Sequence, residues 1–118
     1  MTDRDGDLVL DPAPLVRDLA AASAGGADPG ALAWAFHEAL AKGTAALAGH
    51  AATTTGVRTV GLSGGVYVNR LLLAATTRLL QERDLEVLTH ARVPANDGGL
   101  TLGQVAVGHR HQTQTPPR

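Results

Sequence analysis

The chain has 118 residues, a formal net charge of -1 and no cysteine, and only 3% of its residues are aromatic. This length fits about one small domain, and the balanced charge excludes an overall positive field that would favour nucleic acid. The absence of cysteine excludes a disulfide framework, a thiolate zinc site and a cysteine nucleophile within this chain.

No targeting or membrane segment is indicated by the sequence. Residues 1–20 contain several aspartates and no long apolar core, which differs from a secretory signal, and no apolar run elsewhere is long enough to span a bilayer. We therefore expect a cytoplasmic protein with no membrane partner.

The first half of the chain predicts a short extended segment followed by two helices. Residues 7–11 are the extended segment, and residues 12–21 carry apolar side chains at helical spacing. After a loop, Asp28 and Pro29 are a typical helix start. One face of this long helix holds Leu32, Phe36, Leu40 and Leu47. The segment Thr53-Thr54-Thr55-Gly56 is expected to end it, near Ala51.

The second half predicts a strand, a helix, a strand and a final helix between Val60 and Val107. Residues 58–63 form a β-branched strand, Asn69 can cap a helix that runs to Arg83, and residues 85–89 are the next strand. Residues 100–108 form the last helix, in which Leu102, Val105 and Ala106 are expected to pack. This order is typical of an α/β fold with parallel pairing of the two strands.

Two polar turns follow the predicted strands, where open α/β folds bind their ligands. In the first, Leu62 to Asn69 reads LSGGVYVN, and Gly64 and Gly65 would let the backbone approach a ligand closely. Asn69 adds an amide that both donates and accepts. Plain turn chemistry is the competing interpretation, because the spacing of a known phosphate loop is absent.

The second turn, residues 92–99, reads RVPANDGG and carries one carboxylate, Asp97. A helix cap is one interpretation of Asp97 and a metal ligand the other, although a single carboxylate holds a divalent ion poorly. His90 ends a strand and would bond the backbone or contact a ligand. His37 fits a satisfied histidine on the surface of a helix.

Taken together, residues 62–72 and 90–104 closely resemble the C-terminal end of the HypF carbamoyltransferases, which act in nickel–iron hydrogenase maturation. A weaker likeness at residues 10–15 and 35–37 extends the resemblance over residues 8–108. The wider family includes O-carbamoyltransferases and threonylcarbamoyl transferases. Tyr67 and Val68 replace the Phe-Gln that is common in the family, a mild change.

The resemblance implies the second lobe of an actin-like ATPase fold, related to sugar kinases and Hsp70, with residues 1–108 as an incomplete C-terminal lobe and residues 109–118 as a flexible tail. Members of the family make carbamoyl-adenylate from carbamoyl phosphate and ATP. They then pass the carbamoyl group to the C-terminal cysteine thiol of the maturation protein HypE.

Carried over by position, Gly64, Gly65 and Asn69 would line the adenosine side of the carbamoyl-adenylate site. Asp97 would be a ligand of a divalent metal that is shared with the first lobe. Three further residues would line the site: His90, Asn96 and Gly98.

The resemblance also implies missing parts. The first lobe with its histidine ligands, and the more N-terminal HypF domains, are absent from this sequence, so we expect no complete catalytic set and an inactive chain when alone. The missing domains would be supplied in cis or in trans, and the surface left exposed would favour a homodimer. The alternative function is a non-catalytic module, derived from the same lobe, that binds a nucleotide or a protein.

Overall fold

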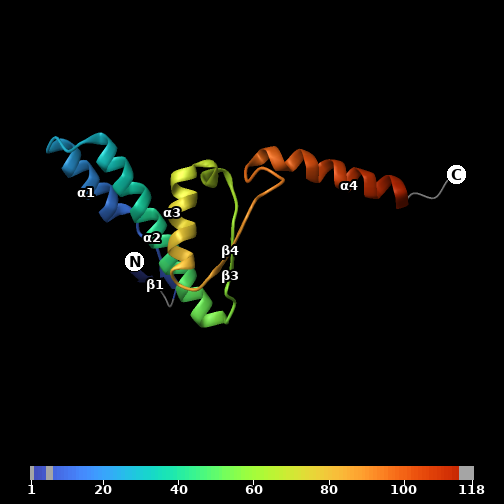
Figure 1. Ribbon diagram of the computed structural model, residues 1–118, viewed down its shortest axis with the longest axis horizontal. Coiled ribbons are helices and arrows are strands. Elements are labelled where there is room, and N and C mark those ends of the chain that lie inside the picture. Colours follow the sequence, from blue (N-terminus) through green and yellow to red (C-terminus); the bar gives the residue numbers. More distant parts are fainter. Residues whose placement is uncertain (1, 5–6, 115–118) are drawn as a thin grey trace.

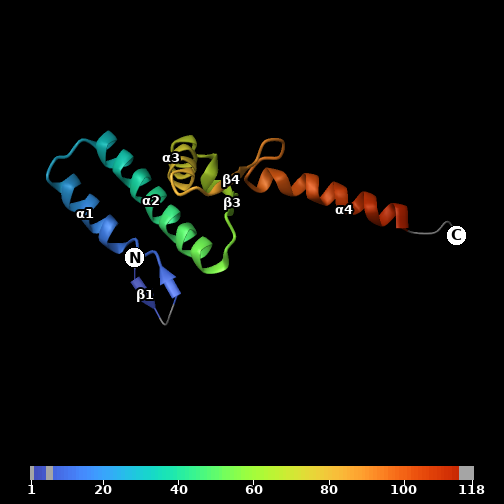
Figure 2. The same cartoon turned by 60° about the horizontal axis from the view of Figure 1, so that its bottom comes forward.

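The computed structural model describes the backbone of residues 2–4 and 7–114 and the side chains of residues 8–110. Strand β1 (Thr2–Arg4) pairs antiparallel with β2 (Asp7–Val9). Helix α1 (Ala13–Ala24) and the longer helix α2 (Pro29–Thr55) follow and lie side by side (Figures 1 and 2). The predicted extended segment at residues 7–11 is confirmed over residues 7–9, which form β2.

A strand, helix, strand and helix follow, as predicted for the second half. Strand β3 (Thr59–Leu62) leads into a short 3-10 turn, η1 (Gly65–Val68), and then α3 (Arg70–Gln81). Strand β4 (Glu86–Thr89) pairs in parallel with β3, with Val60 opposite Val87. A second 3-10 turn, η2 (Asp97–Gly99), precedes α4 (Leu100–Gln114).

Helix α2 begins as predicted and ends later than predicted. The Asp28 carboxylate accepts a hydrogen bond from the Ala31 N–H at 2.8 Å, which caps the N-terminus. The expected end near Ala51 is too early, because the hydroxyls of residues 53–55 each donate to the carbonyl four residues earlier and so fit the last turn. Gly56, with φ of +76°, supplies the left-handed residue that ends the helix.

The core lies between α2, α3 and the sheet. The α2 residues inside it are Ala41 and Ala45, both 0% exposed, whereas Phe36 is 37% exposed. The predicted leucine and phenylalanine face of α2 is therefore only partly buried: Leu40 packs against the core, but the fully buried positions are the two alanines. The small alanine side chains let α2 and α3 approach closely, and leucines of α3 fill much of the core between them. The remaining buried apolar residues are Leu62, Leu72, Ala75, Leu79, Leu80 and Leu85.

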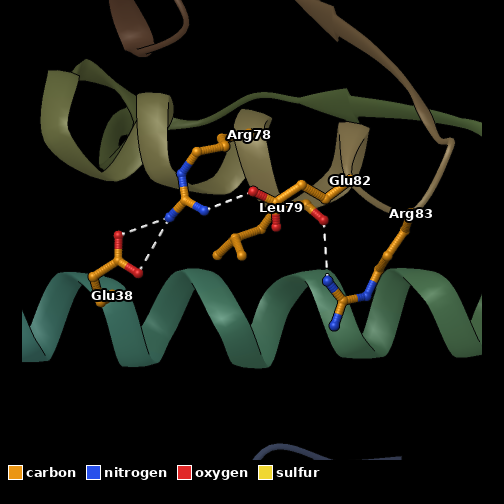
Figure 3. A network of polar contacts seen from close by, with 5 residues as sticks. All are labelled: Glu38, Arg78, Leu79, Glu82 and Arg83. Atoms are coloured by element: carbon orange, nitrogen blue, oxygen red, sulfur yellow. Dashed lines mark hydrogen bonds and ion pairs between the residues drawn. The ribbon is translucent and has the colours of Figure 1, made fainter.

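A polar network joins α3 to α2 at the edge of this core (Figure 3). Arg78 Nη2 lies 3.0 Å from Glu38 Oε1 on α2, and Arg78 Nη1 lies 2.8 Å from Oε1 of Glu82, the C-cap residue of α3. Hydrogen bonding to Glu82, with Glu38 in support, raises the pKa of Arg78. Arg83 donates to the Leu79 carbonyl at 3.1 Å while its side chain crosses α2.

Helix α4 projects away from the rest of the molecule (Figures 1 and 2). All of residues 100–110 are exposed, so the prediction that Leu102, Val105 and Ala106 pack is wrong. The radius of gyration is 19.5 Å, against about 13 Å for a compact domain of this length.

The last helix also runs past its predicted end at Gly108 and continues through Gln114. A glycine lowers helix propensity without ending a helix, and the next proline after the start of α4 is Pro116. Part of the predicted tail at 109–118 is thus helical, and residues 115–118 lie outside the described residues. No helix in the described part of the chain has both the length and the apolar character needed to cross a membrane.

Candidate functional site

The two polar turns meet at the carboxyl ends of the parallel strands. Ser63 follows β3 and His90 follows β4, and the His90 Nε2 atom lies 2.9 Å from the Ser63 Oγ atom. The Gly64 N–H donates to the Ala95 carbonyl at 2.8 Å. Turns that are far apart in sequence therefore form one structure, at the position where α/β folds bind ligands.

A cleft of about 470 Å³ lies between these turns. Its lining includes Tyr67 and Val68 from η1 and residues 89–96, which run from the last residue of β4 into the second turn. His90 and Asn96, both predicted to line the site, are part of this wall, and Arg92 brings a positive charge to it. The size suits a small organic ligand, since such pockets are commonly about 300–1,000 Å³.

The glycine turn leaves its backbone open. Gly64 has φ of +100° and ψ of 161°, a region that is essentially reserved for glycine. A Cβ atom at Gly64 would meet no heavy atom within 4 Å, and one at Gly65 would only reach Asn96 Cβ at 4.0 Å. Backbone conformation at Gly64, rather than crowding, thus requires the glycine, and a ligand could approach the main chain there.

Asn69 is the N-cap of α3, as predicted. Its Oδ1 atom accepts hydrogen bonds from the Leu71 and Leu72 N–H groups at 3.0 and 3.2 Å. Its Nδ2 atom lies 2.8 Å from the Nε2 atom of His37 on α2. The sequence predicts that His37 is an isolated residue on the surface of a helix. No sequence motif links His37 to Asn69, because only the packing of α3 on α2 brings the two residues together.

The second turn is capped by Asn96 rather than by Asp97. Asn96 Oδ1 accepts from the Gly98 N–H at 3.1 Å, and the Gly99 N–H donates to the Asn96 carbonyl. A Cβ atom at Gly99 would lie 2.9 Å from Val93 Cγ1, so this glycine is required by crowding. Asp97 is exposed, and its carboxylate has no hydrogen bond or ion pair among the described residues.

The described residues do not fit a metal site by themselves. Nowhere in this part of the chain do three histidine, aspartate or glutamate side chains come close enough together to hold an ion. Asp97 offers a single carboxylate, and stable metal sites in proteins use several ligands.

Comparison with known proteins assigns this chain to a protein family. Residues 1–104 match the family described as the carbamoyltransferase, Kae1-like domain, second subdomain. The chain belongs to the HypF carbamoyltransferase family. It is 44% identical over 102 residues to the carbamoyltransferase HypF of Rhizobium leguminosarum bv. viciae, which covers 86% of this chain and 13% of that protein. The predicted resemblance to HypF is confirmed.

Two further HypF relatives support the assignment. A carbamoyltransferase HypF homolog of Cupriavidus necator is 39% identical over 117 residues, or 96% of this chain and 29% of that protein. The crystal structure of T. kodakarensis HypF superposes with a TM-score of 0.72 at 30% identity, covering 85% of this chain and 13% of that one. The small α/β fold therefore resembles the matching part of HypF, and this chain spans a minor part of its relatives' length.

Proposed function

We propose that this chain forms the second lobe of an actin-like carbamoyltransferase domain. The domain passes a carbamoyl group from carbamoyl-adenylate to the C-terminal cysteine thiol of a HypE-like protein in hydrogenase maturation. Membership of the HypF family supports the reaction class. The observation that carries the proposal is the hydrogen bond from the Gly64 N–H to the Ala95 carbonyl, which joins the two turns around one cleft.

In this proposal the first turn contacts the adenosine part of ATP or carbamoyl-adenylate. A Cβ atom at Gly64 would meet no heavy atom within 4 Å, and one at Gly65 would meet only Asn96 Cβ at 4.0 Å, which fits the close approach of a nucleotide. Asn69 lies at the N-terminus of α3, where an amide N–H can bind an acceptor atom of the ligand.

Asp97 would supply one ligand to a divalent metal, with the others coming from outside this chain. Its exposed carboxylate is uncommitted among the described residues, which supports this role. When bound, such an ion would offset negative charge on the substrate. Gly98 places no side chain beside Asp97, and a Cβ atom there would lie 3.0 Å from Asn96 Oδ1.

The partners in this proposal are a HypE-like acceptor and the other HypF domains, in cis or in trans, acting in the cytoplasm. The site on this chain is one side of a shared site, so we expect the chain alone to be inactive. Exposed apolar residues on α4, such as Leu100 at 65% and Val105 at 64%, also suit a homodimer when no other domain covers them.

The experiment measures carbamoyl transfer to a HypE-like thiol from ATP and carbamoyl phosphate. We expect transfer when the chain is joined to the remaining HypF domains and none from the chain alone. Asp97→Ala should abolish transfer in the joined protein, whereas Asp18→Ala on the exposed face of α1 should not. Transfer by the lone chain would contradict its inactivity, and full activity of Asp97→Ala would remove Asp97 from the site.

The second candidate is a non-catalytic module that binds a nucleotide or a protein. It is favoured by one observation, the lack of any group of three or more metal-ligating side chains in the described residues. Calorimetry of the lone chain with AMP separates the two functions. Measurable binding supports a module with a self-sufficient site, whereas no binding supports a site that needs the other lobe.

A further inference from the structure

The amide of Asn69 is held in one orientation by three hydrogen bonds. Its Oδ1 atom faces two backbone N–H groups, those of Leu71 and Leu72, which can only donate. The Nδ2 atom must therefore face His37, at 2.8 Å from its Nε2 atom. Reversing the amide would place Nδ2 against two donors, so the assignment of oxygen and nitrogen is fixed by chemistry.

The same reasoning fixes the tautomer of His37. Its Nδ1 atom lies 2.7 Å from the Ala33 carbonyl, which can only accept, so Nδ1 carries the hydrogen. The Nε2 atom then has a lone pair that accepts from Asn69. The ring is further oriented by an edge contact with Phe36, whose centroid is 5.8 Å away at an angle of 89°.

We infer that His37 is a positioning residue for the nucleotide-contacting turn. As a neutral ring with its hydrogen on Nδ1, it ties α2 to Asn69 and so holds the start of α3, directly after the glycine turn. The inference rests on the proposed function, in which Asn69 contacts the nucleotide.

These hydrogen bonds also determine how the Asn69 amide can bind a ligand. Its Oδ1 atom is occupied by the α3 backbone, and one Nδ2 hydrogen is directed to His37. One N–H remains without a partner among the described residues. Asn69 therefore acts toward a ligand as a donor, and the ligand atom that it contacts is an acceptor, such as a ribose oxygen or an adenine nitrogen.

The tautomer can be measured on the chain with no ligand present. In a ¹⁵N-labelled sample, the two-bond couplings between ring protons and nitrogens distinguish hydrogen on Nδ1 from hydrogen on Nε2. We expect the Nδ1–H form for His37, the less common one in water. Hydrogen on Nε2 at neutral pH would overturn the inference.

Three variants test the link to Asn69. His37→Leu removes the acceptor, and we expect the Asn69 side-chain amide signals to move. His37→Gln offers an amide oxygen in its place and should restore them, whereas His50→Leu, an exposed position on the same helix, should leave them unchanged. Unchanged Asn69 signals in His37→Leu would overturn the inference. If His37→Leu does not fold, the tautomer and the His37→Gln spectrum still decide.

The affinity for AMP then tests whether His37 influences nucleotide binding through Asn69. Loss of one such hydrogen bond should weaken AMP binding about twofold to tenfold in His37→Leu, with His37→Gln and His50→Leu close to wild type. Wild-type affinity in His37→Leu would overturn the positioning role. If the lone wild-type chain binds no AMP, the site needs the other lobe, and the same variants are compared in the chain joined to the remaining HypF domains. Absence of AMP binding to this lobe in the joined protein would overturn the nucleotide site of the proposed function, while the tautomer and amide measurements still decide the role of His37.

Discussion

Leu10 rests so closely on α2 that a Cβ atom at Gly43 would lie 2.7 Å from its Cδ1 atom. Gly43→Ala would gain about 1 kcal/mol of helix propensity but would push the half-buried Leu10 away, so we expect little net change in the free energy of unfolding. Gly49→Ala is the matched control, because its Cβ would meet Arg83 Cδ at 3.4 Å.

The flexible Arg83 side chain can move aside, so Gly49→Ala should stabilise the protein by about 0.5–1 kcal/mol. Urea unfolding of both variants provides the measurement. Equal stabilisation by the two substitutions would mean that Leu10 does not pack on Gly43 in solution.

Thr76 predicts a stabilising substitution. It is 0% exposed, and its hydroxyl has no hydrogen-bond partner in the described part of the chain. Thr76→Val keeps the shape and removes the unpaired polar group, which should raise the free energy of unfolding by about 1–2 kcal/mol. Thr77→Val, at the neighbouring half-buried position, should change it little. A loss of stability in Thr76→Val would show that the hydroxyl does find a partner.

Gly64 and Gly61 predict opposite responses to alanine. Gly64 has φ of +100°, and alanine there should cost about 1–3 kcal/mol through backbone strain. Gly61 lies in β3 with no atom within 4 Å of its Cβ position, so Gly61→Ala should be close to neutral. Thermal unfolding compares the two. Equal melting temperatures would mean that the turn relaxes to a conformation that alanine accepts.

The fold was predictable where local chemistry decides it. Asp28 and Asn69 are N-caps in both the sequence and the structure, and the parallel pairing of β3 and β4 follows from their spacing around one helix. The end of α2 could not be predicted in this way. Threonines usually favour extended backbone, but here their hydroxyl groups donate hydrogen bonds to carbonyls of the preceding helical turn.

Long-range packing explains the other differences. In an alanine-rich helix such as α2 the apolar face is poorly defined by sequence, so the burial of Ala41 and Ala45 depends on where α3 docks. The same docking creates the contact between His37 and Asn69. By contrast, both turns of the candidate site were found from sequence, since each directly follows a strand.

We expect the ion pairs of Arg78 to contribute to the stability of the fold by an amount that depends on salt concentration and not on pH. Its side chain is 50% exposed and that of Glu38 18%, so Arg78→Met should lower stability, and added salt should reduce the difference. Arg17→Met, on the exposed side of α1, is the control.

The sign for pH follows from the raised pKa of Arg78. A raised pKa contributes stability that is fully present below the pKa of the unfolded state and is lost only as the pH rises through the still higher pKa of the folded state. The stability difference between wild type and Arg78→Met should therefore be constant from about pH 6 to 9, where arginine is charged. A titrating difference in that range would assign the effect to another group.

We expect helix α4 to contribute little to the free energy of unfolding, because its side chains are exposed. Val105 is 64% exposed, whereas Leu80 on α3 is 0% exposed. Val105→Ala should leave the free energy of unfolding within about 0.5 kcal/mol of wild type, while Leu80→Ala should cost about 2–5 kcal/mol.

Hydrogen exchange tests the same point without substitution. A helix of this length is marginal in water when it packs on nothing, so amides of residues 100–110 should exchange much faster than those of α3. Joining the chain to the other HypF domains should slow them if those domains cover α4. Strong protection in the lone chain at low concentration would mean that α4 folds back onto the core in solution, whereas protection that grows with concentration would indicate that a second copy covers it.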